Sequence, residues 1–260
     1  MWAIFLSLHI YNTYHPSQLT SSINHNDLVD VTQRVIREQT RQEQSLPHGV
    51  IGIDQMEYYQ WLHLFVFYRW ISSSQPASLE DCLEQSHYIF GIIFLRNFDL
   101  LTSFQAYIHL TDNSIPNQFF STDESKKLID FIPMILVCCN EKELHEKLKS
   151  DIHYSPSVLC FQRIASLNTQ LKPLDNVEVI WDFLIIYGMQ NIVFIEAAWI
   201  IILKEEILNG SYSNNTFPDW DPLVLIRKTI EVFKKTYEYC RNESADQTIK
   251  NKMHTLFANV

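Results

Sequence analysis

Glycine and proline are scarce in this chain, which has five glycines and nine prolines in 260 residues. It also lacks regular alternation of apolar and polar residues. Sandwiches, barrels and doubly wound sheets need frequent turn residues, so this scarcity argues against them. The sequence therefore predicts an all-α fold, and its length favours one domain over residues 1–260. We divide that domain into an N-terminal half of about 1–110 and a C-terminal half of about 111–260.

Clustered basic residues are also missing. The net charge is −10, and no run of Lys and Arg exceeds two residues. Nucleic-acid-binding proteins carry basic patches, so we expect no nucleic-acid partner. Residues 183–203 are long enough to cross a bilayer, but Gln190, Asn191 and Glu196 near the middle would be costly there. A pair of buried helices explains this segment better, and partners are expected to be protein surfaces.

Motifs for catalysis and metal binding are lacking as well. There is no phosphate-binding glycine loop, GxSxG, HExxH or pair of CxxC. Five cysteines, an odd number, do not form a disulfide framework, which favours a reducing compartment. One set has the residue types of metal ligands, but its spacing fits no zinc module: Cys138, Cys139, His145, His153 and Cys160. We predict no metal and no cofactor.

Two apolar helical patterns between Pro173 and Leu208 are the most informative feature. The first places four large side chains at i, i+3, i+4 and i+7, on one face of a helix: Val177, Ile180, Trp181 and Leu184. Asp175 is expected to be its N-cap and Gly188 its end. Residues 192–208 are apolar on nearly all sides and are predicted to form a central buried helix.

Further helices are predicted at about 79–96, 98–110, 123–137 with an interruption at Pro133, and 141–150. In the first two helices, the apolar residues cover a wider part of the helix surface than one core-facing stripe. One interpretation is complete burial in a large helical fold. The other is a groove that binds a partner helix, for which the candidate residues are Tyr88, Ile92, Leu95 and Phe98.

The order of an aliphatic residue, Trp181-Asp182, an apolar half-turn, Gly188 and an apolar helix resembles the C-terminal half of the TBC domain. This is the all-helical fold of Rab GTPase-activating proteins. The segments 154–167 and Phe217-Pro-Asp-Trp-Asp221, followed by a last amphipathic helix, are similar to the same family. Trp2 and the following His15-Pro16-Ser17 resemble its opening helix, which implies that the chain begins partway through that motif.

The resemblance raises a catalytic question. Active TBC proteins supply an arginine from IxxDxxR and a glutamine from YxQ, and such an arginine contributes about 10³ to 10⁵ in rate. The nearest arginine here is Arg34, but it follows Asp30 by four residues instead of three, which turns the side chain by about 100° on a helix. Gln60 fits YxQ, yet a bulky Trp61 follows it. Arg34 and Gln60 are therefore candidates only if the chain is a GTPase-activating protein.

Within the family, the small size and the degenerate motifs resemble the small non-catalytic TBC-domain subunit of the tuberous sclerosis complex. That resemblance implies no enzyme activity, a hamartin-like coiled-coil partner, a role in mTOR signalling, and a cytoplasmic location with attachment to endomembranes through the complex. The alternative is a GTPase-activating protein of the spindle-checkpoint type that acts on a Rab-like small GTPase. The C-terminal block of such proteins is matched here by Pro173–Phe183 and Phe217–Asp221.

Overall fold

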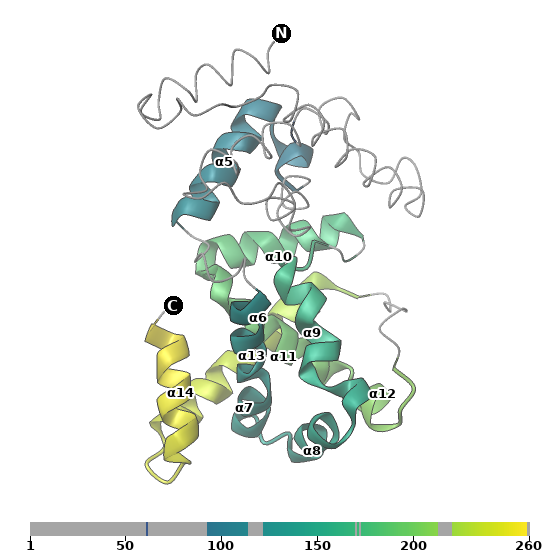
Figure 1. The fold of residues 1–260 in the computed structure, drawn as a ribbon, viewed down its shortest axis with the longest axis vertical. Helices are drawn as coiled ribbons and strands as arrows, with labels where there is room; N and C mark the ends of the chain where they lie inside the picture. Colours follow the sequence, from purple (N-terminus) through teal and green to yellow (C-terminus); the bar gives the residue numbers. More distant parts are fainter. Residues whose placement is uncertain are drawn as a thin grey trace, which may run out of the picture. The chain divides into compact units, whose positions relative to one another are not determined.

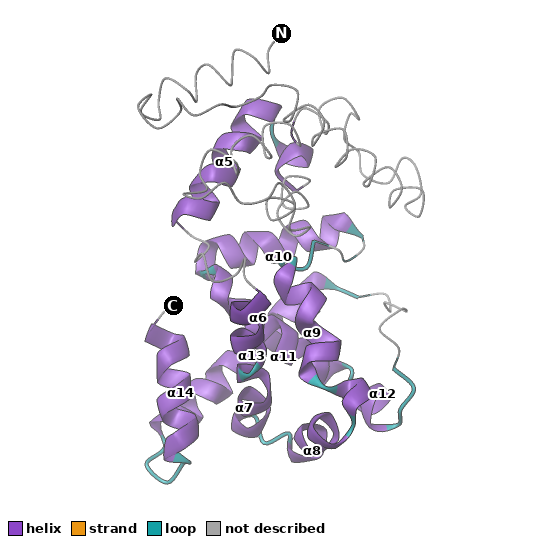
Figure 2. Cartoon of the chain, viewed as in Figure 1, coloured by secondary structure: helices purple, strands orange, loops and turns teal. Residues whose placement is uncertain are grey.

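The computed structural model describes residues 61, 93–113, 122–169, 171, 173–212 and 220–258, and these are the residues discussed below. They form helices and connecting loops, with no strand among them (Figure 2). The all-α prediction is confirmed for this part of the chain. The chain divides into two compact units, Met1–Leu110 and Thr111–Val260. The expectation of a single domain stays a prediction.

The first unit is described mainly through α5, Leu100–Asn113, which begins two residues after the predicted helix start. Asp99 fixes that start, because its side chain accepts hydrogen bonds from the backbone N–H groups of Leu101 and Thr102 at 3.0 and 3.1 Å. These bonds lower the pKa of Asp99. On the inner face, Trp61 meets Phe104 and Tyr107 edge to face, with ring centroids 5.9 and 5.3 Å apart.

The second unit consists of nine described α-helices and two short 3-10 turns. Their bounds are α6 Thr122–Ile129, α7 Phe131–Cys138, α8 Lys142–Ser150, η4 Ile152–Tyr154, α9 Pro156–Ala165, α10 Leu174–Tyr187, η5 Met189–Asn191, α11 Ile192–Ile202, α12 Lys204–Leu208, α13 Pro222–Arg241 and α14 Gln247–Ala258. Helix α11 is central, since α7, α9, α12 and α13 all pack against it (Figure 1).

Helix α10 confirms the predicted core face. Its buried residues are Val177, Ile180, Trp181 and Leu184. The helix ends at Tyr187 because Gly188 has φ 101°, a conformation that other residues rarely adopt. The predicted N-cap is wrong: Pro173 occupies that position and Asp175 lies in the first turn. The negative charge of Asp175 in the first turn still stabilises the helix, because it interacts favourably with the positive end of the helix dipole.

Helix α11 confirms the predicted buried segment, because every residue from Ile192 to Ile200 is buried. The helix is shorter than predicted. It ends at Ile202, and Leu203 forms a turn before the short α12. Among the described helices, none combines the length and the apolar character that a bilayer crossing requires.

The predicted helix over 123–137 is interrupted in a different place. The break falls at Asp130, between α6 and α7, and Pro133 lies within the first turn of α7. Proline is tolerated there because the first N–H groups of a helix have no partner inside the helix. Helix α8 covers Lys142–Ser150, close to the predicted 141–150.

The amphipathic helix expected after Asp221 is α13, whose first residue is Pro222. The side chain of Asp221 caps it by accepting a hydrogen bond from Leu223 N at 2.8 Å. It is not the last helix, because α14 follows and packs on α13 and α7. Phe257 of α14 contacts Phe233 of α13, with ring centroids 5.6 Å apart.

Candidate functional site

Most of the residues predicted to act lie outside the described part of the chain. This holds for Arg34 and Gln60, the candidate catalytic pair, and for Tyr88 and Ile92 of the candidate groove. Of the other two groove residues, Leu95 is buried at 6% exposure, whereas Phe98 is 51% exposed. The burial of Leu95 fits a core position, and Phe98 alone remains at the surface. The groove as a whole stays a prediction.

The most distinctive polar feature of the second unit is an ion pair inside it. Arg163 of α9 donates from Nε to Oε2 of Glu196 in α11 at 2.7 Å, and the side chains are 6% and 0% exposed. Arg163 also lies over the Trp199 ring, 5.6 Å from guanidinium carbon to ring centroid. The pair therefore ties α9 to the central helix at a point closed to solvent.

Burial and pairing act in opposite directions on this carboxylate. Burial raises the pKa of Glu196, while Arg163, Asn168 and Cys160 lower it by contacting the charged form. For Arg163, burial opposes the charge but the carboxylate outweighs it, so the pKa of the guanidinium is raised. Burial is the larger effect on Glu196, so its pKa is raised on balance, and removal of either partner would leave the other group buried without its counter-charge.

The turn after α9 is strained next to this pair. Leu167 and Asn168 have φ values of 47° and 65°, which are uncommon for residues other than glycine, and both are buried. Trp181 stabilises the turn by donating from Nε1 to Leu167 O at 2.9 Å. The tryptophan of the Trp-Asp block therefore has a structural role, whereas Asp182 is exposed on the outside of α10.

This buried cluster cannot act on a substrate, since its charged atoms are closed to solvent. Its role is to join α9, α10 and α11. We did not predict the pair from sequence. The available signal was Glu196 itself, because a carboxylate inside an apolar helix requires a buried cation.

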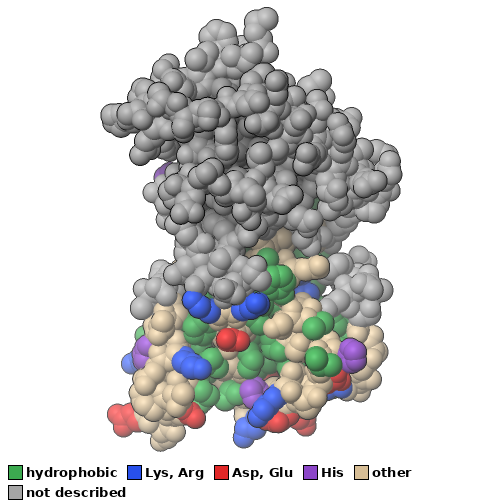
Figure 3. All heavy atoms as spheres, in the orientation of Figure 1, with side chains coloured by type: hydrophobic (Ala, Val, Ile, Leu, Met, Phe, Trp, Pro, Cys, Tyr) green, Lys and Arg blue, Asp and Glu red, His purple; other side chains and the backbone are tan. Residues whose placement is uncertain are grey.

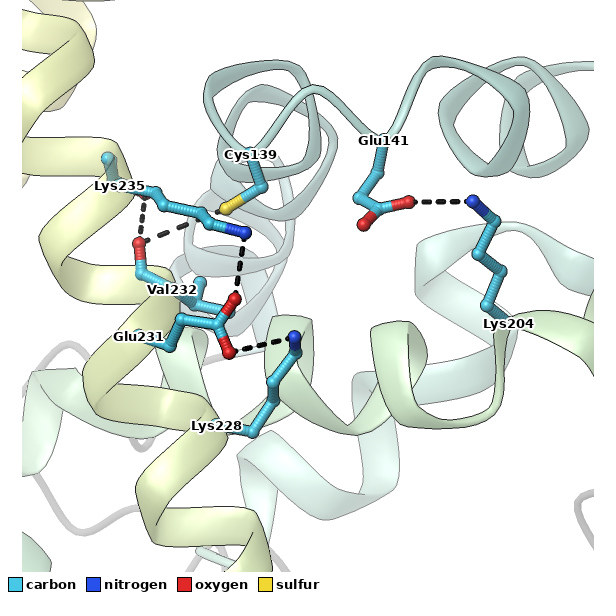
Figure 4. A network of polar contacts seen from close by, with 8 residues as sticks. Cys139, Glu141, Lys204, Lys228, Glu231, Val232 and Lys235 are labelled. Carbon is cyan, nitrogen blue, oxygen red and sulfur yellow. Dashed lines mark hydrogen bonds and ion pairs between the residues drawn. The ribbon is translucent and has the colours of Figure 1, made fainter.

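A second polar network lies at the surface of the second unit (Figure 4). Glu231 accepts from Lys228 at 3.0 Å and from Lys235 at 2.8 Å, all on α13. Lys204 of α12 pairs with Glu141 at 3.0 Å, linking α12 to the start of α8. In the face drawn in Figure 3, apolar and basic side chains lie side by side over this unit.

The described cysteines, Cys138, Cys139, Cys160 and Cys240, are all buried and free. Burial is the main cause that raises the pKa of Cys138 to about 12 and of Cys139 to about 11. Within the described ranges, no group of three or more His, Cys, Asp or Glu side chains could hold a metal ion. The thiols are therefore packing residues.

The comparison with family models finds a match that spans parts of both units. Residues 83–208 match the model of the Rab-GTPase-TBC domain, a little under half of the chain. The match includes the Trp-Asp block, the buried ion pair and α11. It supports the TBC, or Rab-GAP, domain family for this chain, and it suggests regulation of a small GTPase.

Among curated proteins, the chain is similar to a putative mitotic check point protein BUB2 from Dictyostelium discoideum. The two are 26% identical over 149 residues, which cover 55% of this chain and 39% of the relative. The chain thus spans about two fifths of that protein's length. No solved structure gives a significant match.

Proposed function

We propose that this protein regulates a Rab-like small GTPase as a TBC-type interaction subunit, without supplying catalytic groups itself. The observation that carries the proposal is the contrast between a clear family match at 83–208 and the displaced arginine of the N-terminal segment. Arg34 follows Asp30 by four residues, one more than the family motif allows. On a helix, that extra residue directs the side chain away from the expected position.

The arginines of the matched segment support the same proposal. It contains two, Arg96 and Arg163. Arg163 is 5% exposed and bound to Glu196, so it cannot reach a nucleotide on another protein. An arginine finger has to extend into the transition state of phosphoryl transfer, which requires a free side chain. The matched segment therefore offers at most Arg96, which has no IxxDxxR motif around it.

The partner that we propose is a coiled-coil subunit of the hamartin type, bound in an assembly like the tuberous sclerosis complex. In that arrangement the GTPase-activating residues belong to another subunit, and this chain stabilises the assembly upstream of mTOR signalling. The protein would then be cytoplasmic and attached to endomembranes through its complex. This proposal rests on the length of the chain, on the resemblance at Trp2 and at Trp181-Asp182, and on the degenerate motifs.

A second candidate is a GTPase-activating protein of the spindle-checkpoint type. The observation that favours it is the similarity to a protein whose name describes a putative mitotic check point function. Under this proposal Arg34 and Gln60 would act on the nucleotide. The two candidates therefore differ in whether the chain alone accelerates GTP hydrolysis.

Single-turnover GTP hydrolysis by a panel of purified Rab-like GTPases separates the two. We expect no acceleration by the full chain, and no difference between the wild type and the variants Arg34→Ala and Gln60→Ala. Acceleration that is lost in either variant, and kept in the neighbouring control Arg37→Ala, would refute the non-catalytic proposal. Calorimetric titration with a hamartin coiled-coil fragment then tests the partner. Absence of binding there would refute the hamartin-type assembly while leaving GTPase regulation open.

A further inference from the structure

Helix α13 has an exposed stripe along its outer side, in which Tyr237 also contacts Phe257 of α14, with ring centroids 6.2 Å apart. Along its outer side, apolar and basic residues alternate with spacings of four and three. The stripe consists of Leu223, Arg227, Ile230, Lys234, Tyr237 and Arg241, all of them exposed. The three apolar members are 53%, 41% and 49% exposed. Apolar and basic positions each repeat every seven residues, which is the spacing of facing positions in paired helices.

The core-facing side of the same helix is satisfied. Its buried residues are Leu225, Thr229, Val232, Thr236 and Cys240. Both threonine hydroxyls donate to the backbone carbonyl four residues earlier, at 2.8 Å. The two sides therefore have separate roles: one packs against α10, α11 and α7, and the other is exposed except where Tyr237 meets α14.

The charges of the stripe are open to an incoming ligand. Lys228 and Lys235, which lie beside the stripe, both pair with Glu231. By contrast, Arg227 and Lys234 make no ion pair with any described residue. Arg241 lies over the Tyr237 ring, 5.9 Å from guanidinium carbon to centroid, and has no carboxylate partner in the described part of the chain. Three unpaired cations stand on this face of a chain whose net charge is −10.

We propose that the α13 stripe binds an acidic amphipathic helix of a partner protein. Apolar residues of that helix, repeated every seven positions, would pack on Leu223, Ile230 and Tyr237, and its carboxylates would pair with the cations between them. The 20 residues of α13 span about 30 Å, enough to face roughly three heptads.

An anionic membrane fits the stripe less well. A helix lying on a membrane presents a continuous apolar face, whereas the apolar residues here are separated by cations. The strong negative charge of the whole chain also opposes approach to an anionic surface. The regular repeat of seven in turn favours a helical ligand over an extended one.

The proposal deepens the proposed function, because a coiled-coil subunit with an acidic outer face would be such a helix. It does not depend on which GTPase is regulated or on how hydrolysis occurs. Failure of the hydrolysis experiments would therefore leave it intact, and failure of the binding experiment below would leave GTPase regulation open.

The test uses a fluorescent peptide of three heptads with leucine or isoleucine at the two core positions and glutamate at the flanking ones. Binding to the full chain is followed by fluorescence anisotropy at low and high salt. We expect saturable binding that weakens with salt, and no binding of the same peptide with lysine in place of glutamate. The double variant Arg227→Glu/Lys234→Glu should weaken binding at least about tenfold, and so should Ile230→Ser.

Lys252→Glu is the matched control, because Lys252 is exposed on α14 and lies outside the stripe. Its affinity should stay within about twofold of the wild type. Circular dichroism verifies that each variant is folded, which is expected because all altered side chains are exposed. Equal affinity of wild type and stripe variants would overturn the proposal. So would stripe-dependent binding to phosphatidylserine vesicles without peptide binding, or a dimer of the free chain that Ile230→Ser dissociates.

Discussion

The buried ion pair gives the sharpest prediction about stability. Arg163→Met and Glu196→Leu each remove one partner and leave the other charge inside the unit. The double variant removes both charges and replaces them with apolar side chains. Because the side chains are only 6% and 0% exposed, water cannot solvate the remaining charge without local opening of the helices.

The expected magnitudes follow from this burial. Each single variant should lower the free energy of unfolding of the second unit by about 3–5 kcal/mol. The double variant should be less destabilised than either single one, since replacing a buried pair with apolar residues is often close to neutral. Non-additivity of this kind is the signature of a direct interaction. Lys204→Met, which breaks a partly exposed pair with Glu141, should destabilise the unit much less than either single variant of the buried pair.

Hydrogen exchange followed by mass spectrometry measures the effect locally. Peptides from α9 and α11 report the free energy of opening of this unit, independently of the other unit. The two single variants should exchange faster in both helices, and the double variant should recover part of the protection. Additive losses in the double variant, or a single variant that exchanges like the wild type, would show that the pair does not hold α9 to α11.

Two further predictions concern the backbone and the thiols. Gly188→Ala should destabilise the second unit by about 1–3 kcal/mol, because Gly188 has φ 101°, a conformation that is strained for alanine. Urea denaturation followed by tryptophan fluorescence measures this, and unchanged stability would contradict it. Cys138 and Cys139 should resist iodoacetamide at pH 8 until the chain unfolds, because burial keeps both thiols protonated. Their folded pKa values of about 12 and about 11 exceed the ordinary 9.0, so their contribution to stability is constant below about pH 9 and is lost progressively as the pH rises from 9 through 11 to 12, because the unfolded thiols ionise first. Rapid labelling of the folded chain at pH 8 would refute that account.

The parts of the fold that were predicted correctly are those set by apolar periodicity. The buried face of α10 and the burial of α11 follow from the spacing of large apolar residues, which local pattern alone reveals. The end of α10 followed from one glycine, because few other residues adopt its backbone conformation. Each of these features depends on residues that lie within about two helical turns of one another in the sequence.

The errors arose where local signals compete. The sequence pattern predicts an interruption at Pro133, yet a proline in the first turn is compatible with a helix, and the break lies at Asp130. The sequence pattern predicts Asp175 as an N-cap, although Pro173 is the N-cap and the helix begins at Leu174. The Arg163–Glu196 pair joins residues 33 positions apart, so no local pattern contains it. The stripe on α13 was missed because exposure on a helix depends on which face the rest of the chain covers.

The packing of α13 and α14 on α11 has a practical consequence for the choice of fragments to express. Phe194 of α11 packs against Phe233 and Phe257, with ring centroids 5.1 and 6.1 Å apart, and both rings belong to helices beyond residue 208. The family match ends at residue 208. A fragment cut at that limit would leave one side of the most apolar helix open to water, and a contiguous apolar patch of that kind promotes aggregation. Fragments intended for expression should therefore extend through α14, so that solubility is not confused with loss of function.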